Sequence, residues 1–359
     1  MAHPTTPYDP STPLRHLLRL AIPICRRGER DLPPRGPGRP VEVPEWAVAV
    51  MILVALAKRL TSKSAQYRFL DAHADALVAR LGLPRFPARS TYFQRYRTAS
   101  VLMVAAAAAH TDHAAARGHI DVRCVASDKT LIAAAGPPWH QAQRRRGERP
   151  KAVDAEASWS RSAHDGWVYG YGLEAVVTAP RRGVIWPLIA SADPAHRREA
   201  KTLPDKASRL PAGVRYVLVD MGYDSNDLGE ALEYDGRGRR TGRRLVGPHQ
   251  VRHNRYGPRE KVWRETRGRR RRREHRAARR RFYASRFGRS LYKRRGKTVE
   301  PFFGRFKALF GLEEHVWHPG LSNNRTRSLA ALLLYQLLLV YNRVKGEGNA
   351  EVKWILDLL

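Results

Sequence analysis

The chain has 359 residues, of which 43% are hydrophobic, enough for two domains or for one large domain with an appendage. Its 66 Lys and Arg residues outnumber 33 Asp and Glu residues, and the net charge of +33 indicates a polyanionic partner, most often nucleic acid. An anionic membrane surface, ribosomal RNA or a GC-rich genome would fit the same arginine excess. Cys25 and Cys124 are too far apart to suggest a disulfide scaffold, and no apolar run reaches the ~20 residues of a membrane span. We therefore expect a soluble cytoplasmic protein.

The first third of the chain reads as helical. Residues 1–43 alternate an apolar, Arg-containing piece with a Pro/Gly-rich piece, which we interpret as an arm with one short helix and a linker. Residues 44–117 predict a helix over 46–60, another over 64–81 that stops at Gly82, and a third that begins near Ser90 or Thr91. The third helix starts with basic and aromatic residues, so we interpret 44–117 as a helical DNA-binding region, with a plain helical bundle as the alternative.

Beyond residue 117 the pattern changes to alternating strands and helices, typical of an α/β sheet. A strand over 119–127 ends on Asp128, and a buried strand over 214–219 ends on Asp220. The remaining predicted elements are a hairpin of strands over 168–179 and 183–192, helices over 195–210 and 226–232, a short strand over 244–246, and a polar loop over 139–151. This order predicts three antiparallel strands followed by parallel additions, with helices on both faces, in a domain over 118–345.

An Arg-rich insertion at 252–290 interrupts this domain, and ten of the fifteen residues from 267 to 281 are Arg. Such a run is often a solvated face or a disordered tail, but its place inside the chain favours a basic strip beside a working site. Apolar residues then predict a helix over 298–310 and a closing helix over 321–342, before a tail at 346–359.

Three acidic residues are expected to meet at one edge of the sheet: Asp128, Asp220 and Glu300, the last on the helix over 298–310. Each alone could be a helix or loop cap. Together they match the oxygen ligands that Mg²⁺ prefers, and a pair of such ions can promote in-line displacement at phosphorus. A lysine, Lys307, lies two turns after Glu300 on the same helix face. Zinc is not indicated, because the pair His196 and Glu199 stands without a further ligand motif.

Four motifs resemble the bacterial insertion-sequence transposases of the DDE class, and the likeness covers residues 85–345. They are SDKT (127–130), YGYGLEAVV (169–177), LVDMGYDS (218–225) and KTVEPFFGRFKALFGLE (297–313). The resemblance implies a ribonuclease H-like mixed sheet flanked by helices. It also implies a metal-dependent polynucleotidyl transferase in which Asp128, Asp220 and Glu300 bind two Mg²⁺ ions, with Mn²⁺ as a substitute.

One subgroup of this family carries the signature Y-x2-R-x3-E-x6-K. Tyr292, Arg295, Glu300 and Lys307 match it, except that four residues rather than three separate Arg295 from Glu300. Lys129 also replaces the small residue expected after the first acid. The predicted DNA contacts are Lys307, Lys297, Arg294, Arg295, Tyr292, Arg270 and Arg272.

The resulting hypothesis is a transposase that cleaves transposon ends and joins them to target DNA, working as a homodimer on double-stranded DNA in a bacterial cytoplasm at the nucleoid. Two alternatives stay open: a nuclease on the same fold, and a DNA-binding protein without catalysis, derived from a transposase.

Overall fold

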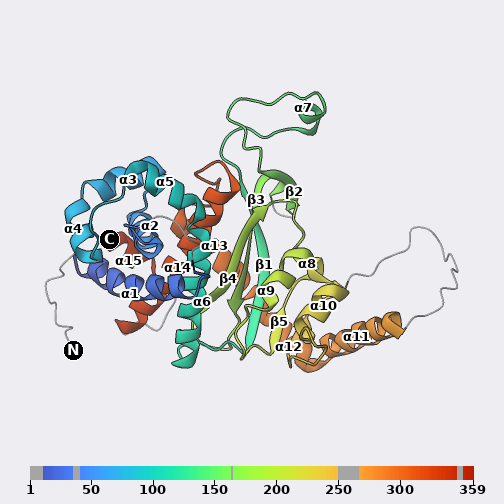
Figure 1. The fold of residues 1–359 in the computed structure, drawn as a ribbon. Coiled ribbons are helices and arrows are strands. Elements are labelled where there is room, and N and C mark those ends of the chain that lie inside the picture. The colour runs from blue at the N-terminus through green and yellow to red at the C-terminus, as the bar shows by residue number, and fades with distance from the viewer. Residues whose placement is uncertain (1–10, 35–40, 163–164, 250–266, 346–350) are drawn as a thin grey trace.

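The computed structural model describes residues 11–34, 41–162, 165–249, 267–345 and 351–359 (Figure 1). Six helices form the N-terminal part: α1 (Ser11–Arg30), α2 (Glu45–Ala57), α3 (Lys63–Asp71), α4 (Ala74–Leu81), α5 (Arg89–Thr98) and α6 (Ser100–Ala116). They gather on one side of the sheet (Figure 1). The helical pattern predicted for 44–117 is therefore confirmed.

Three details of this region differ from the sequence-based prediction. The helix α1 is 20 residues long rather than short, and it packs against α2 and α6 through buried Leu17, Ala21 and Cys25. The helix predicted over 64–81 is two helices, because the chain turns between α3 and α4. Tyr92 and Tyr96 of α5 are fully buried, so they form part of the core and do not offer an aromatic surface to DNA.

A six-stranded mixed sheet forms the second part. Its strands are β1 (Cys124–Ala133), β2 (Ser158–Ser162), β3 (Gly166–Thr178), β4 (Pro187–Pro194), β5 (Tyr216–Leu218) and β6 (Arg244–Val246). The order is β2-β3-β1-β5-β6, and β4 also pairs with β3. Pairing is antiparallel among β1, β2, β3 and β4 and parallel from β1 through β5 to β6. The predicted mixed sheet is confirmed, with β2 as an additional strand.

The first strand runs through Asp128 rather than ending on it. Residues 125–133 pair with β3 along their whole length, whereas β5 pairs only with residues 124–126. Asp128 therefore lies at the point where β5 leaves β1. The prediction of a strand end was wrong because the partner strand β3, far along the chain, supports β1 for five residues beyond Asp128.

Short helices connect the later strands: α7 (Gln141–Arg145), α8 (Glu199–Thr202), α9 (Pro204–Ala207), a 3-10 helix η1 (Met221–Tyr223) and α10 (Asn226–Glu233). The helix predicted over 195–210 is interrupted, because α8 ends at Thr202 and α9 begins at Pro204. A buried ion pair between Lys206 and Glu174 of β3 fixes this segment on the sheet, and the Thr202 hydroxyl donates to the same carboxylate at 2.6 Å. The segment of α8 is thus held firmly beside β1 and β5.

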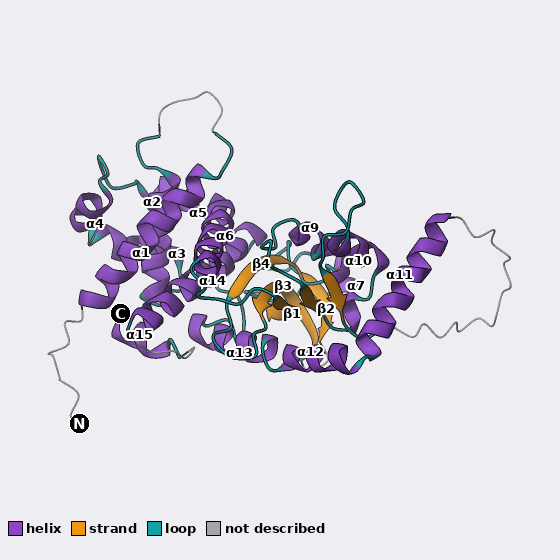
Figure 2. Cartoon of the chain, turned by 90° about the horizontal axis from the view of Figure 1, so that it is seen from below, coloured by secondary structure: helices purple, strands orange, loops and turns teal. Residues whose placement is uncertain are grey.

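The C-terminal part comprises α11 (Arg267–Ala284), α12 (Arg286–Gly296), α13 (Val299–Phe310), α14 (Leu321–Val344) and α15 (Lys353–Leu358). Helices α12 and α13 lie along one side of the sheet, opposite α9 and α10 (Figure 2). The Arg-rich run expected at 267–281 is an ordered helix, and 250–266 of the insertion lie outside the described residues.

The core of the molecule is centred on α14, which is buried over most of its length and contacts α2, α6 and β4. Part of the expected tail is the helix α15. It contacts the residues that directly follow α2: Lys58 donates to the carbonyl of Leu359, and Arg59 forms an ion pair with Asp357. None of the helices in the described ranges is long and apolar enough for a bilayer.

Candidate active site

Two aspartates are brought side by side by strand pairing. In the parallel ladder of β1 and β5, Ala126 lies opposite Leu218. Asp128 follows Ala126 by two residues and Asp220 follows Leu218 by two residues, and at this point the two strands begin to separate. This edge, at the carboxyl end of β5, is where ligand sites of open α/β sheets form. The Oδ1 atom of Asp220 accepts the backbone N–H of Gly222 at 2.7 Å, which fixes the carboxylate at the start of η1.

The Asp128 carboxyl lies where its negative charge is disfavoured. The pKa of Asp128 is raised to about 6, mainly by burial, with smaller contributions from the negative charges of Asp220 and Glu199. The Arg295 guanidinium and the Lys129 backbone N–H, which donates to Asp128 Oδ1 at 2.9 Å, act in the opposite direction. Asp220 and Glu199 are therefore close enough to disfavour the charged form of Asp128.

The third predicted acid, Glu300, joins this group through Arg295. Arg295 Nη2 lies 2.6 Å from Asp128 Oδ2, and Arg295 Nη1 lies 3.9 Å from Glu300 Oε1. Glu300 is 67% exposed and stands in the first turn of α13, where an acid also complements the helix dipole. The extra residue between Arg295 and Glu300 falls in the break at Lys297 and Thr298 between α12 and α13. Because the helix is interrupted there, the changed spacing does not separate the two side chains.

Tyr292 lies near the two aspartates, whereas Lys307 contacts β1 further along the strand. Burial raises the pKa of Tyr292, Arg295 lowers it, and the negative charges of Asp220 and Asp128 raise it further. Tyr292 is half-buried and packs edge-on against Tyr283. Lys307 donates to the carbonyl of Leu131 on β1 at 3.1 Å, and burial lowers its pKa. Its ammonium therefore lies at β1 three residues beyond Asp128, where Asp165 and Glu313 are the acids that raise its pKa.

Two of the predicted DNA contacts at the α12–α13 junction point elsewhere. Arg294 donates to the carbonyl of Ala179 at 3.5 Å and lies near Cys124, away from the acids. Lys297 is exposed at the junction itself. Neither side chain contacts the aspartates, so any contact they make with DNA is peripheral to the acids.

The sequence analysis missed the role of Glu199 in this group. Lys129 Nζ lies 3.1 Å from Glu199 Oε1, and Nζ also donates to the carbonyl of Arg197 at 2.8 Å. A methyl group at Gly222, next to Asp220, would lie 3.8 Å from Glu199 Oε2. Glu199 thus approaches the aspartates from α8, held by the lysine that replaces a small residue after Asp128. The signal in the sequence was Lys129, because a lysine at a position where a small residue is expected indicates an acidic partner nearby.

Lys129 needs space to reach α8, and Gly172 of β3 provides it. A methyl group at Gly172 would lie 2.8 Å from Lys129 Cδ. The glycine in the YGYG motif therefore allows the lysine side chain to cross the sheet. His196 instead bonds Ser158 Oγ at 2.8 Å through Nδ1, so the pair of His196 and Glu199 does not form a zinc site.

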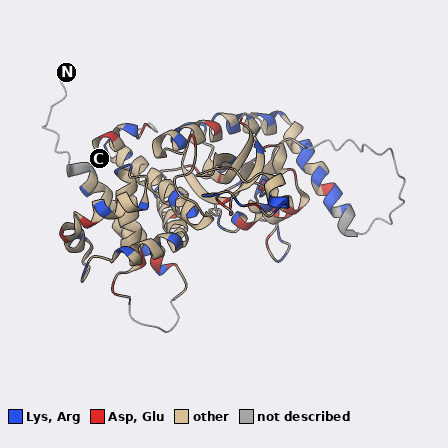
Figure 3. Cartoon of the chain, turned by 90° about the horizontal axis from the view of Figure 1, so that it is seen from above, with Lys and Arg blue, Asp and Glu red and all other residues tan. Residues whose placement is uncertain are grey.

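A cleft of about 680 Å³ lies between α8, the start of α10 and α11, and of the four acids described above only Glu199 lines it. Glu199 and Gly222 line its inner part, and Arg198, Lys201, Arg272 and Arg276 supply its positive charge. Figure 3 shows α11 extending from the body, with Arg residues along its length. Arg270 pairs with Glu274 on the helix surface, whereas Arg272 pairs with Glu230 of α10.

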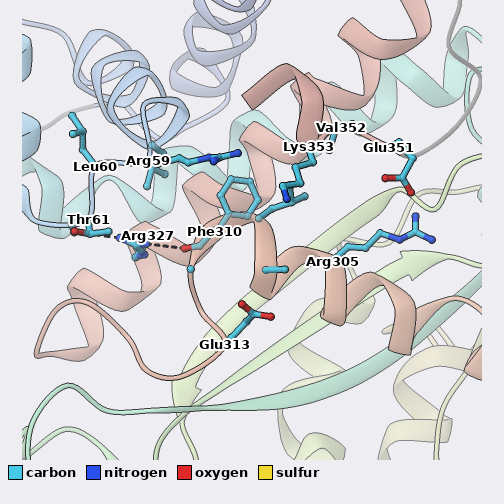
Figure 4. A pocket seen from close by; sticks show the side chains of 14 residues that line it. Arg59, Leu60, Thr61, Arg305, Phe310, Glu313, Arg327, Glu351, Val352 and Lys353 are labelled. Atoms are coloured by element: carbon cyan, nitrogen blue, oxygen red, sulfur yellow. Dashed lines mark hydrogen bonds between the residues drawn. The ribbon is translucent and has the colours of Figure 1, made fainter. Parts of the chain in front are cut away.

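Another cavity, of about 520 Å³, lies between α2, α13, α14 and α15 (Figure 4). Arg305 lines it from α13, and buried Arg327 donates to the carbonyls of Phe310 and Thr61 at its wall. It borders a different face of α13 from the one that carries Glu300. It is therefore not part of the carboxylate group.

The donor set suits a hard divalent cation, because Asp128, Asp220, Glu300 and Glu199 offer only carboxylate oxygens. Within the described residues, however, no three acidic or His/Cys ligands converge closely enough to coordinate an ion as they stand. The Arg295 guanidinium, placed between Asp128 and Glu300, supplies the positive charge there. The residues therefore fit a divalent cation in type.

A comparison with protein families identifies the family of the chain. The family model described as a transposase DDE domain matches residues 121–337. The chain belongs to this family. The matched DDE domain begins just before β1 and ends within α14, so it includes all three predicted acids and α11. The resemblance to transposases of the DDE class is thereby confirmed. Helices α1–α6 precede the matched DDE domain, and a comparison with curated proteins produced no match.

Proposed function

We propose that the protein is a DNA transposase with a ribonuclease H-like catalytic domain, in which Asp128, Asp220 and Glu300 bind two Mg²⁺ ions or Mn²⁺ in their place. The observation that carries this proposal is the parallel pairing of β1 with β5, which sets Asp128 beside Asp220, while Arg295 links Asp128 to Glu300. Membership of the transposase DDE family supplies the reaction class. Glu199 is the fourth carboxylate of the site.

In this proposal Asp128, Asp220 and Glu300 would hold the cations, which would supply Lewis-acid chemistry at the scissile phosphate and at the attacking oxygen. A water molecule attacks first and releases a 3′-hydroxyl at the transposon end, and that hydroxyl then attacks the target strand. Lys307 and Tyr292 orient the phosphate beside Asp128. Lys129 holds Glu199 in place and does not touch DNA.

DNA is held by charge over a wider surface. Arg270 and Arg272 of α11, with Lys297, Arg294 and the exposed arginines of the 44–117 region, provide contacts to phosphate that do not depend on base sequence. Because two transposon ends must be brought together, we propose a homodimer on DNA, at the bacterial nucleoid.

A strand-transfer assay tests this function. A transposon end with a free 3′-hydroxyl is incubated with a target plasmid and Mg²⁺, with the native protein, Glu300→Gln, and Glu314→Gln as a matched control on an exposed side chain. The proposal predicts joined product with the native protein and the control, and none with Glu300→Gln. Cleavage without joining would favour a nuclease, and DNA binding without either reaction would favour the non-catalytic alternative.

A further inference from the structure

Arg295 occupies a position that a cation at the acids would have to take. Its side chain is 12% exposed, and its Nη2 contacts the Oδ2 atom of Asp128 at 2.6 Å. The other oxygen of Asp128 accepts the Lys129 backbone N–H. Both oxygens of the central carboxylate are therefore engaged. Because like charges repel strongly at such short range, an ion at Asp128 and the guanidinium in this pose exclude each other.

The same guanidinium is incompletely satisfied where it lies. Its Nε is buried and has no hydrogen-bond partner among the described residues. Its Nη1 lies 3.9 Å from Glu300, longer than a hydrogen bond. A phosphate that accepts from Nε and one Nη together would satisfy both donors, since guanidinium binds phosphate well in this two-bond geometry.

The backbone allows such a change of position. Arg295 stands in the last turn of α12, and the helix stops at Gly296 before α13 begins at Val299. The long side chain can therefore turn from Asp128 towards the exposed junction without moving Glu300, which belongs to the next helix.

We propose that Arg295 is a placeholder for the metal: it neutralises Asp128 and Glu300 when no ion is bound, and ion binding transfers it to a DNA phosphate. This inference rests on the proposed metal site. Its consequence is that DNA and metal strengthen each other's binding, because DNA accepts the arginine that the ion displaces, and such coupling is reciprocal.

The test is a calorimetric titration of Mn²⁺ into the native protein, Arg295→Gln, Arg295→Lys and the control Arg305→Gln, without DNA. Arg305 is exposed on α13 and lines the separate cavity. Arg295→Gln is expected to bind Mn²⁺ on the order of tenfold more tightly, the usual size of such coupling, while the control and Arg295→Lys stay near the native value. Thermal unfolding of each variant confirms that it is folded.

The titration is then repeated with an end DNA already cleaved at its 3′ terminus. DNA is expected to strengthen Mn²⁺ binding by the native protein and to do so much less for Arg295→Gln. Equal Mn²⁺ affinity of Arg295→Gln and the native protein, with binding abolished by Asp128→Asn, would overturn the placeholder and leave the metal site intact. Equal tightening by the Gln and Lys variants would overturn it as well. A Mn²⁺ affinity that is unchanged in Asp128→Asn would contradict the proposed metal site itself.

Discussion

At the scale of single residues, Asp128 combines two opposing influences. Burial disfavours its charge, and Arg295 with the Lys129 N–H favours it, but burial is the larger influence, so the pKa rises to about 6. The folded protein without metal therefore keeps an ionised Asp128 at a cost in stability. A cation that lowers this cost is bound more tightly for that reason.

This predicts a pH-dependent effect of Asp128→Asn in the absence of metal. Because the folded pKa lies above the ordinary value of 3.8, the group's contribution to stability is present below about pH 4 and is lost as the pH rises through about 6. At pH 7.5 with EDTA, the free energy of unfolding of Asp128→Asn should be on the order of 2 kcal/mol higher than that of the native protein. Near pH 4 the difference should vanish.

Urea unfolding at the two pH values measures this difference. The control is Asp357→Asn, which breaks an exposed pair with Arg59 and should change the free energy of unfolding by less than about 1 kcal/mol. A variant at Asp128 that is less stable at pH 7.5 would show that the ion pair with Arg295 outweighs burial.

Glu199 gives a second prediction at this scale. It lies beside the aspartates and is held by Lys129, so Glu199→Gln should lower the rate of DNA cleavage by roughly 10- to 100-fold, as loss of a supporting group at a metal site does. DNA affinity should be unchanged. Cleavage kinetics compared with Glu148→Gln, an exposed residue of the α7 loop, measure the effect. Unchanged kinetics in the Glu199 variant would restrict this residue to anchoring Lys129.

At the scale of elements, α11 is attached to the DDE domain by several side chains: Arg272 pairs with Glu230, Arg276 pairs with Asp224, and Arg279 is buried. Arg279 donates to the Ser225 carbonyl at 3.1 Å and to Asn226 Oδ1 at 3.0 Å, both at the start of α10. Its guanidinium lies against Gly229, where an added methyl group would be 2.1 Å from Nη1. The absence of a side chain at Gly229 is therefore what allows α11 to rest on α10.

We predict that Gly229→Ala loosens α11. Alanine favours a helix over glycine by about 1 kcal/mol, but here it collides with the Arg279 guanidinium. The expected result is weaker DNA binding and faster amide exchange in α11, with exchange in α13 and α14 unchanged. Hydrogen exchange measured by mass spectrometry tests this. The matched control Gly304→Ala lies in a helix with open space around the site, so α11 protection should stay as in the native protein.

The elements also show what sequence can predict. Helices α10, α13 and α14 and strand β6 follow local apolar periodicity and capping, and their predictions were confirmed. The course of β1 through Asp128 depends on β3, and the ordering of α11 depends on Arg279 with α10; both are contacts between distant segments. The aspartates could be located because each follows an apolar run, whereas Glu199 could be linked to them only once Lys129 was seen to reach α8.

At the scale of the whole molecule, positive charge is spread over both parts, but α11 presents it on an element that extends from the body (Figure 3). Salt therefore provides a measure of its role, because each phosphate contact on duplex DNA adds about 0.9 to the slope of log affinity against log salt. Changing Arg270, Arg272 and Arg280 to Gln should lower the slope by about 2 to 3.

Fluorescence anisotropy with labelled duplex DNA at several salt concentrations measures the slope. A control with Arg15, Arg19 and Arg27 of α1 changed to Gln removes the same charge from a helix remote from the sheet, and its slope should fall by less than about 1. Equal slopes for the two triple variants would mean that α11 contributes only general charge.

The most direct test of the account is cleavage of labelled DNA that bears the ends of the element encoding this chain, with Mg²⁺ or EDTA. The native protein is compared with Asp220→Asn and with the control Asp227→Asn, an exposed acid of α10. The account predicts Mg²⁺-dependent release of the 3′ end by the native protein and the control. Asp220→Asn should lower the rate by more than about a hundredfold, beyond the loss expected for a merely supporting residue. Cleavage by Asp220→Asn at the native rate would contradict the assignment of the active site.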